Sequence, residues 1–232
     1  MFLPLYDVDN KVTRIPWPFV THAIIALNIV VFLIVNGMPA DSGAGTVAWL
    51  SYRPDGIPPS AANLPVPGLD LPVFVGAVTS LFLHHDFMHI LGNMLFLWVF
   101  GDNVEDAFGH LRFLAFFLIC GVIACVAQDL MTEPGYIFYG ASGATSGIVA
   151  AYLMLHPHVR LWVLVLFRIP LRIPAFVVLG FWVLFQIFNA LTDVDGAVAW
   201  YAHLGGFAVG ALLTPFLKKP GVPLFDRGVK LR

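Results

Sequence analysis

The chain has 232 residues, of which 59% are hydrophobic and only 11% are charged, and its formal net charge is −2. A soluble domain carries about 25% charged residues, so the composition excludes an ordinary soluble domain and indicates a membrane protein. The net charge says little about partners, because in a membrane protein the position of the charges matters more than their sum, and we expect no nucleic-acid partner.

The N-terminal segment, residues 1–18, carries acidic residues and prolines before any long apolar run. A cleaved signal peptide has a basic region followed directly by an apolar one. We therefore expect the segment to stay on the cytoplasmic side and the first apolar run to be a transmembrane span.

Six apolar stretches approach the length that crosses a bilayer. They cover residues 19–35, 83–100, 111–130, 140–155, 175–191 and 198–217. The sequence thus predicts an all-α membrane protein with six transmembrane helices in one domain, residues 19–217, and a cytoplasmic tail, residues 218–232. A seventh run, LWVLVLF at 161–167, is too short to span, and we interpret it as an interfacial segment or an extension of the fifth helix.

The basic residues orient these spans. If six helices alternate in direction, eleven of the twelve Lys and Arg residues lie on one side, and only Arg53 lies opposite. By the positive-inside rule both termini are cytoplasmic, and we expect a multi-pass protein of the bacterial cytoplasmic membrane. The 38–82 connection then faces outward. It holds seven prolines and no obvious structure of its own, and such long loops are commonly functional, although a passive tether remains an alternative.

Polar side chains within spans are costly and mark function by default. The second predicted helix opens with LHHDFMHILGNM, in which His89 and Asn93 lie one turn apart on one face. The sixth opens with AWYAHLGGFAVG, in which His203, Gly206 and Gly210 share a face. Each motif alone is also compatible with helices that simply pack through glycines and polar residues.

The fourth predicted helix opens with YGASGATSG, which contains two candidate nucleophiles, Ser142 and Ser146. They lie one turn apart, so helical phase does not distinguish them. Ser142 is nearer the outer end, where water is available, and it lies between Gly140 and Gly143 at the positive end of the helix dipole. We predict Ser142 as the nucleophile. Ser146 is expected to pack in a seam of small residues and to donate a hydrogen bond to a carbonyl one turn earlier.

In the derived topology the second, fourth and sixth helices all run inward, so their first turns share one outer level. Ser142 and His203 then form a predicted Ser–His dyad, with the histidine as general base. His89 and Asn93 supply donors for an oxyanion hole, together with the backbone N–H of the serine.

Two other interpretations of these histidines are weaker. HDFMH at 85–89 resembles the zinc motif H-E-x-x-H, but its acid is Asp86, which is one methylene shorter, and no third ligand presents itself. We expect no metal. A small transporter would use a site near the membrane midplane, whereas these residues lie in the outer third.

The combined motifs resemble those of rhomboid intramembrane serine proteases. The matching residues are Ser142 in GASG for GxSG, His89 and Asn93 for HxxxN, His84 for an additional upstream histidine, His203 in AHLGGFAVG for AHxxGxxxG, and Glu105 for a characteristic acid. The resemblance implies a six-helix rhomboid core without a cofactor. It also implies cleavage of transmembrane protein substrates among membrane lipids near the outer face, and a first loop that is partly embedded in the membrane.

One position departs from the family pattern. The residue four beyond the nucleophile is often an aromatic that packs on the catalytic histidine, and here it is Ser146. Trp200 or Tyr201 could take that role, and Asp193 or Asp195 could orient the histidine. A non-catalytic, client-binding rhomboid-like protein is the alternative within the fold. It predicts loss of the serine or the histidine, and both are present.

Overall fold

The computed structural model describes residues 2–7, 13–53, 72–132, 137–165, 168–192 and 198–226. Most of these residues are helical. The helices are α1 (Phe19–Asn36), α2 (Ala40–Leu50), α3 (Val73–Thr79), α4 (Phe87–Phe96), α5 (Asp102–Phe108), α6 (His110–Asp129), α7 (Ser142–Leu155), α8 (Ala175–Thr192) and α9 (Trp200–Leu217). A 3-10 turn, η2 (Ser80–Phe82), follows α3, and a π-helical turn, η3 (Leu97–Gly101), joins α4 to α5.

Within the described residues, α1, α6 and α8 are each long and apolar enough to cross a membrane. A fourth candidate is the pair 73–82 and 87–108, which is bent by 87° at its break. The α7 helix is apolar but has only 14 residues. Helices occupy all six predicted ranges, while length and composition alone identify three or four spans.

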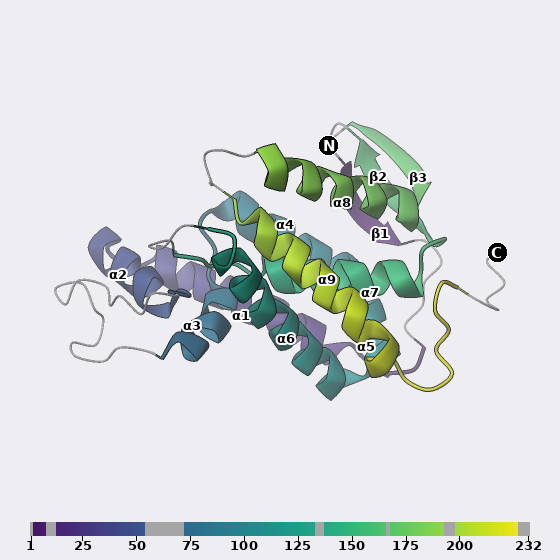
Figure 1. Cartoon of the computed structure of the whole chain (residues 1–232), viewed down its shortest axis with the longest axis horizontal. Helices are drawn as coiled ribbons and strands as arrows, with labels where there is room; N and C mark the ends of the chain where they lie inside the picture. Colours follow the sequence, from purple (N-terminus) through teal and green to yellow (C-terminus); the bar gives the residue numbers. More distant parts are fainter. Residues whose placement is uncertain are drawn as a thin grey trace.

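A small antiparallel sheet, in the order β1-β2-β3, contradicts the all-α prediction. Its strands are β1 (Phe2–Asp7), β2 (Arg160–Val165) and β3 (Ile169–Pro174), and Figure 1 shows them beside α8. The alternative that 161–167 extends the fifth helix was therefore wrong for residues 161–165, which belong to β2, whereas an interfacial position of this segment stays a prediction. Leu161 and Val163 are fully buried, whereas Trp162 faces the other side under the Arg172 guanidinium, so the run follows the two-residue period of a strand.

The long connection between α1 and α4 is more structured than expected. It contains α2 and α3, and the hydroxyl of Thr79 donates to the carbonyl of Leu50, 2.6 Å away, which ties the two helices together. A backbone pair between Tyr52 and Phe138 attaches this connection to the segment before α7. Residues 54–71, which hold most of its prolines, lie outside the described residues. The expectation of a connection without regular structure was wrong for residues 40–50 and 73–79.

The α7 helix forms the centre of the protein, with 11 of its 14 residues buried. It packs on α9 through glycines. Gly206 of α9 lies against the backbone of Gly143, and Gly210 lies against Gly147. Because no side chain separates these backbones, the two helices approach closely enough for short side chains at their first turns to meet.

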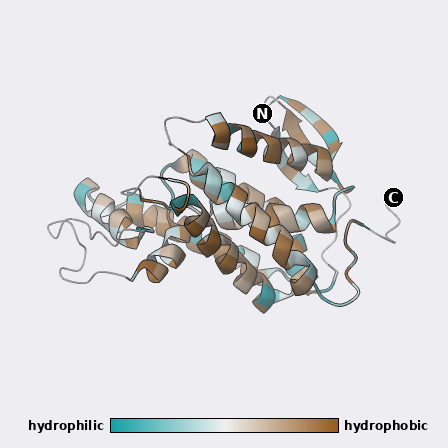
Figure 2. Cartoon of the chain, viewed as in Figure 1, coloured by the Kyte–Doolittle hydropathy of each residue, from teal (hydrophilic) through white to brown (hydrophobic). Residues whose placement is uncertain are grey.

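Most residues of α6 and α8 are hydrophobic, as the colouring of the ribbon in Figure 2 shows, and many of their side chains are exposed. On α8 the most exposed of them are Phe181, Leu184, Phe185, Phe188 and Leu191, each 56–78% exposed. Such a surface is stable when it faces lipid and would be unfavourable in water. The structure thus supports an integral membrane protein.

A buried carboxylate fixes the start of α1. Glu105 is fully buried and accepts hydrogen bonds from the backbone N–H groups of Val20 and Thr21, from the Thr21 hydroxyl and from Nδ1 of His110. Pro18, at the N-cap of α1, offers no side-chain cap. Glu105 therefore satisfies first-turn donors that would otherwise be unpaired in an apolar environment.

Candidate active site

Ser142 is the first residue of α7, two residues after a glycine that the site requires. Gly140 has φ +135°, a backbone conformation that residues with side chains rarely adopt. A Cβ at this position would lie 2.8 Å from Cε1 and 2.9 Å from Nε2 of His89. Glycine therefore allows both the turn into α7 and the close approach of the His89 ring.

Ser142 and His203 form the predicted pair. The Ser142 Oγ lies 2.9 Å from Nε2 of His203, across the interface between α7 and α9. The two residues are 61 positions apart in the sequence, and the glycine contacts of these helices bring their first turns together. This distance is within the hydrogen-bond range that a general base needs to accept a serine proton.

His89 reaches the same place from α4. The N-cap of this helix is Asp86, whose carboxylate accepts the backbone N–H of His89 at 2.8 Å. The His89 ring lies against the backbone of Gly140 and packs edge-on against the buried His84, with ring centroids 5.0 Å apart.

Asn93 lies one turn further along α4 and is buried, with 6% exposure. Its Nδ2 donates to the carbonyl oxygen of His89 at 3.0 Å. An amide nitrogen carries two hydrogens, so this contact uses one of them and leaves one for another acceptor.

Ser146 has a different environment from Ser142. It is 1% exposed, and its hydroxyl donates to the carbonyl oxygen of Ser142 at 2.7 Å, which confirms the predicted bond to the preceding turn. The aromatic contact to His203 comes from elsewhere. The Trp200 ring packs edge-on at a centroid distance of 5.8 Å, and the Trp182 ring of α8 stacks at 6.5 Å, whereas the Tyr201 hydroxyl donates to the carbonyl of Ala190.

Two buried glutamines near His203 were missed in the sequence. Gln186 of α8 is 3% exposed, and its Oε1 lies 2.7 Å from Nδ1 of His203. Gln128 of α6 is 4% exposed, and its Oε1 accepts the backbone N–H of Ala202 at 2.9 Å. Both amides lie in apolar helices, where a polar residue is itself the signal that could have identified them. Asp193 and Asp195, the candidate acids, lie outside the described residues.

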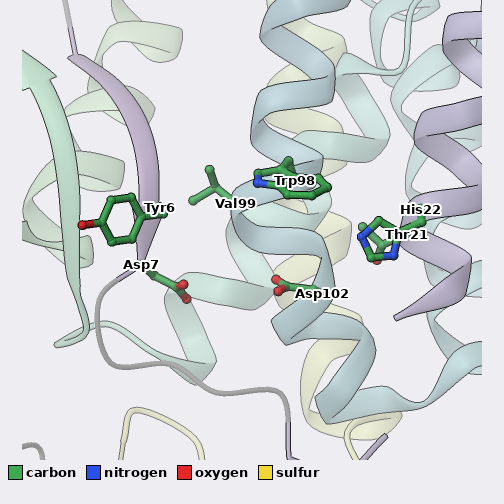
Figure 3. Close-up of a pocket in the computed structure, with 7 residues that line it drawn as sticks. All are labelled: Tyr6, Asp7, Thr21, His22, Trp98, Val99 and Asp102. Atoms are coloured by element: carbon green, nitrogen blue, oxygen red, sulfur yellow. The ribbon is translucent and has the colours of Figure 1, made fainter. Parts of the chain in front are cut away.

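Among the described residues, no group of three or more His, Cys, Asp or Glu side chains is arranged to hold a metal ion. A cavity lined by Asp7, His22, Trp98 and Asp102 lies between β1, α1 and the α4–α5 helix (Figure 3). Asp7 also accepts the hydroxyl of Tyr152, which is ten residues after Ser142 and therefore about 15 Å along α7. The cavity contains none of the predicted site residues.

Comparison with known proteins identifies the family. Residues 73–220 match the family model described as the Rhomboid domain, a range that includes the serine, both histidines and the asparagine. The chain belongs to the rhomboid family.

Several rhomboid-named proteins are similar to it. RHOMBOID-like protein 1 of Arabidopsis thaliana is 28% identical over 91% of this chain and 56% of its own length. Rhomboid protein 1, mitochondrial, of Saccharomyces cerevisiae is 28% identical over 62% of this chain and 42% of its own length. Rhomboid-like protein 11, chloroplastic, of Arabidopsis thaliana is 28% identical over 69% of this chain and 59% of its own length. The rhomboid chain thus spans about half the length of these relatives.

Proposed function

We propose that this rhomboid protein is an intramembrane serine endopeptidase that cleaves transmembrane protein substrates with a Ser–His dyad. The observation that carries the proposal is the 2.9 Å contact between Ser142 Oγ and His203 Nε2. A serine hydroxyl is a weak nucleophile by itself, and a histidine at this distance supplies the base that activates it.

In the proposed reaction, Ser142 Oγ attacks the carbonyl carbon of the scissile peptide bond while its proton passes to Nε2 of His203. The resulting imidazolium gives this proton to the leaving amine as the C–N bond breaks, which leaves an acyl ester on Ser142. A water molecule, deprotonated by His203, then hydrolyses the ester and restores the hydroxyl. The net reaction consumes one water for each peptide bond, and no cofactor takes part.

The oxyanion of the tetrahedral intermediate needs donors beside Ser142. His89 is well situated because its ring contacts Gly140, two residues before the nucleophile. The N–H of Ser142 lies at the N-terminus of α7, where the helix dipole favours negative charge. Asn93, with one amide hydrogen left over from its bond to His89, is the further candidate.

We further propose that residues 19–217 form the protease domain and cross the membrane six times, with residues 1–18 and 218–232 on the cytoplasmic side. Pairing of β1 with β2 supports this topology, because the N-terminal segment must then share one side with the α7–α8 connection. Contacts of Asp106 with Arg14 and Lys219 bring the segment before α1, the α5–α6 turn and the segment after α9 to one end. The tie between Tyr52 and Phe138 joins the two connections expected on the outer side.

Labelling with a fluorophosphonate, which reacts with activated serines, tests the proposal on the purified protein. We expect the wild-type protein to be labelled at Ser142 and to cleave a model transmembrane substrate. Ser142→Ala should lose both activities, and His203→Ala should lose cleavage while remaining folded in detergent. A client-binding protein without chemistry would bind the substrate but would be neither labelled nor active, and that result would overturn the proposed function.

A further inference from the structure

The imidazole of His203 is held at both of its nitrogens. Nε2 faces Ser142 at 2.9 Å, and Nδ1 faces Oε1 of Gln186 at 2.7 Å. Neutral imidazole carries one N–H, and the partner of each nitrogen decides which one carries it. An amide oxygen can only accept, so it favours the proton on Nδ1 and leaves the lone pair of Nε2 directed at the serine hydroxyl.

Burial of the Gln186 amide would destabilise the protein without the hydrogen bond to His203. The side chain is 3% exposed and lies in α8, a helix whose other face presents large apolar side chains. A primary amide buried without a partner loses its hydrogen bonds to water and gains nothing in return. The neighbouring Asn189 is partly buried, and its Nδ2 donates to the carbonyl oxygen of Phe185 in its own helix at 2.7 Å, whereas Gln186 reaches across to another helix.

We propose that Gln186 is a positioning residue for the general base, an inference that rests on the proposed protease function. Its carbonyl oxygen keeps His203 in the tautomer that accepts the serine proton. When His203 takes that proton, Nδ1–H becomes a stronger donor, and the bond to the amide oxygen strengthens as the imidazolium forms. Gln186 thereby takes the orienting place that an aspartate holds in a serine-protease triad, without adding a charge inside the membrane.

Among the described groups around His203, Gln186 is the one that accepts a hydrogen bond from Nδ1. Trp182 and Trp200 contact the ring through their aromatic faces and edges. Ser142 faces it from α7, and His89 of α4 is the neighbouring titratable side chain that interacts with it electrostatically. Gln128 of α6 bonds to the backbone of Ala202. Within the described part of the chain, no carboxylate makes a hydrogen bond or ion pair with the ring.

Substitutions at Gln186 separate positioning from packing. Gln186→Leu keeps the approximate volume and removes the acceptor, whereas Gln186→Glu keeps an acceptor and adds negative charge. We expect Gln186→Leu to lower kcat about 10- to 100-fold with little change in KM, the size of a lost hydrogen bond to a charged group. The acidic limb of its kcat/KM profile should move to lower pH, because protonation of the base is less favourable without the acceptor.

Gln186→Glu should retain more of the wild-type turnover than Gln186→Leu, with its acidic limb moved to higher pH, because a carboxylate favours the imidazolium. Asn189→Leu, one turn along α8, is the matched control and should match the wild-type turnover and profile. Elution as a single detergent-solubilised species checks folding, and the Glu variant decides the question if the Leu variant does not fold. A purely structural glutamine would change stability without moving either limb.

The result that overturns the inference is a wild-type turnover and unshifted profile for Gln186→Leu, or an unshifted profile for Gln186→Glu. Failure of the proposed function looks different. The wild-type protein would then be neither cleaving nor labelled by the fluorophosphonate, and no variant would be needed to see it.

Discussion

The glycine contacts between α7 and α9 should be essential for activity as well as for stability. Replacing Gly210 with alanine tests this at a site two turns from His203, the proposed general base. The added Cβ would lie 2.5 Å from Cα and 2.6 Å from the carbonyl oxygen of Gly147. Ordinary carbon contacts are about 3.5 Å long, so the two backbones must separate by roughly 1 Å. No flexible side chain is there to move aside.

Moving α9 away from α7 at Gly210 would also move His203 away from Ser142, because Gly210 and His203 are seven residues apart on one face of α9. A shift of about 1 Å along the same direction would lengthen the Ser142–His203 contact from 2.9 Å to nearly 4 Å, beyond hydrogen-bond range. Overpacking of this kind costs about 1–3 kcal/mol of stability, and a misplacement of about 1 Å can lower a rate about 100-fold.

The measurement is the rate of fluorophosphonate labelling, together with the unfolding temperature in detergent. Gly210→Ala should label about 100-fold more slowly than the wild-type protein and melt at a lower temperature. Gly180→Ala is the control, because a Cβ at this position of α8 has nothing within 4 Å. Labelling of Gly210→Ala at the wild-type rate would show that the seam does not set the distance between serine and histidine.

Further predictions concern the nucleophile, the oxyanion donors, the buried acid and the topology. Ser142→Ala should abolish labelling and cleavage, whereas Ser146→Ala should retain both, and labelled-peptide analysis decides between them. Asn93→Ala should lower kcat about 10²- to 10³-fold with a smaller effect on KM, and unchanged turnover would remove it from the oxyanion hole. Glu105→Gln should lower the unfolding temperature. The NH2 group of glutamine would take the place of one carboxylate oxygen and leave a backbone N–H without its acceptor, which costs about 1–3 kcal/mol of stability. Reporters at the C-terminus and within 38–82 should show opposite accessibility, and a shared side would contradict the proposed topology.

The elements that sequence analysis found are those whose signal is local. Long apolar runs and polar residues at fixed spacing indicated the helices and brought Ser142 and His203 into one pair. The sheet was missed because its pairing is not local. Leu3 lies opposite Leu164, so no window of sequence contains both partners. The β3 strand also contains Pro170 and Pro174, which are compatible with an edge strand but obscure the strand pattern.

Gln186 was missed for a different reason. It is a polar residue within the apolar stretch FWVLFQIFNAL, and a polar side chain in a membrane span indicates function. No motif around Gln186 distinguishes it, unlike His89, Ser142 and His203. Its partner, His203, became visible only when α8 was placed beside α9. Burial of an amide in such a helix is a useful signal, since the bond that makes the burial tolerable must reach another helix.

Ser142 and Ser146 are distinguished by their position along α7 and not by the helix face on which they lie. Ser142 and Ser146 share a face of α7, so a rotation of the helix that directs one toward His203 directs the other the same way. The difference lies in what each hydroxyl can reach. Ser146 is one turn inside α7, where a carbonyl of the preceding turn is available, and its proton is used there at 2.7 Å. Ser142 begins the helix and meets Nε2 of His203 instead. A nucleophile in a transmembrane helix is therefore favoured at the first turn, where its proton can pass to a base on a neighbouring helix rather than to its own backbone.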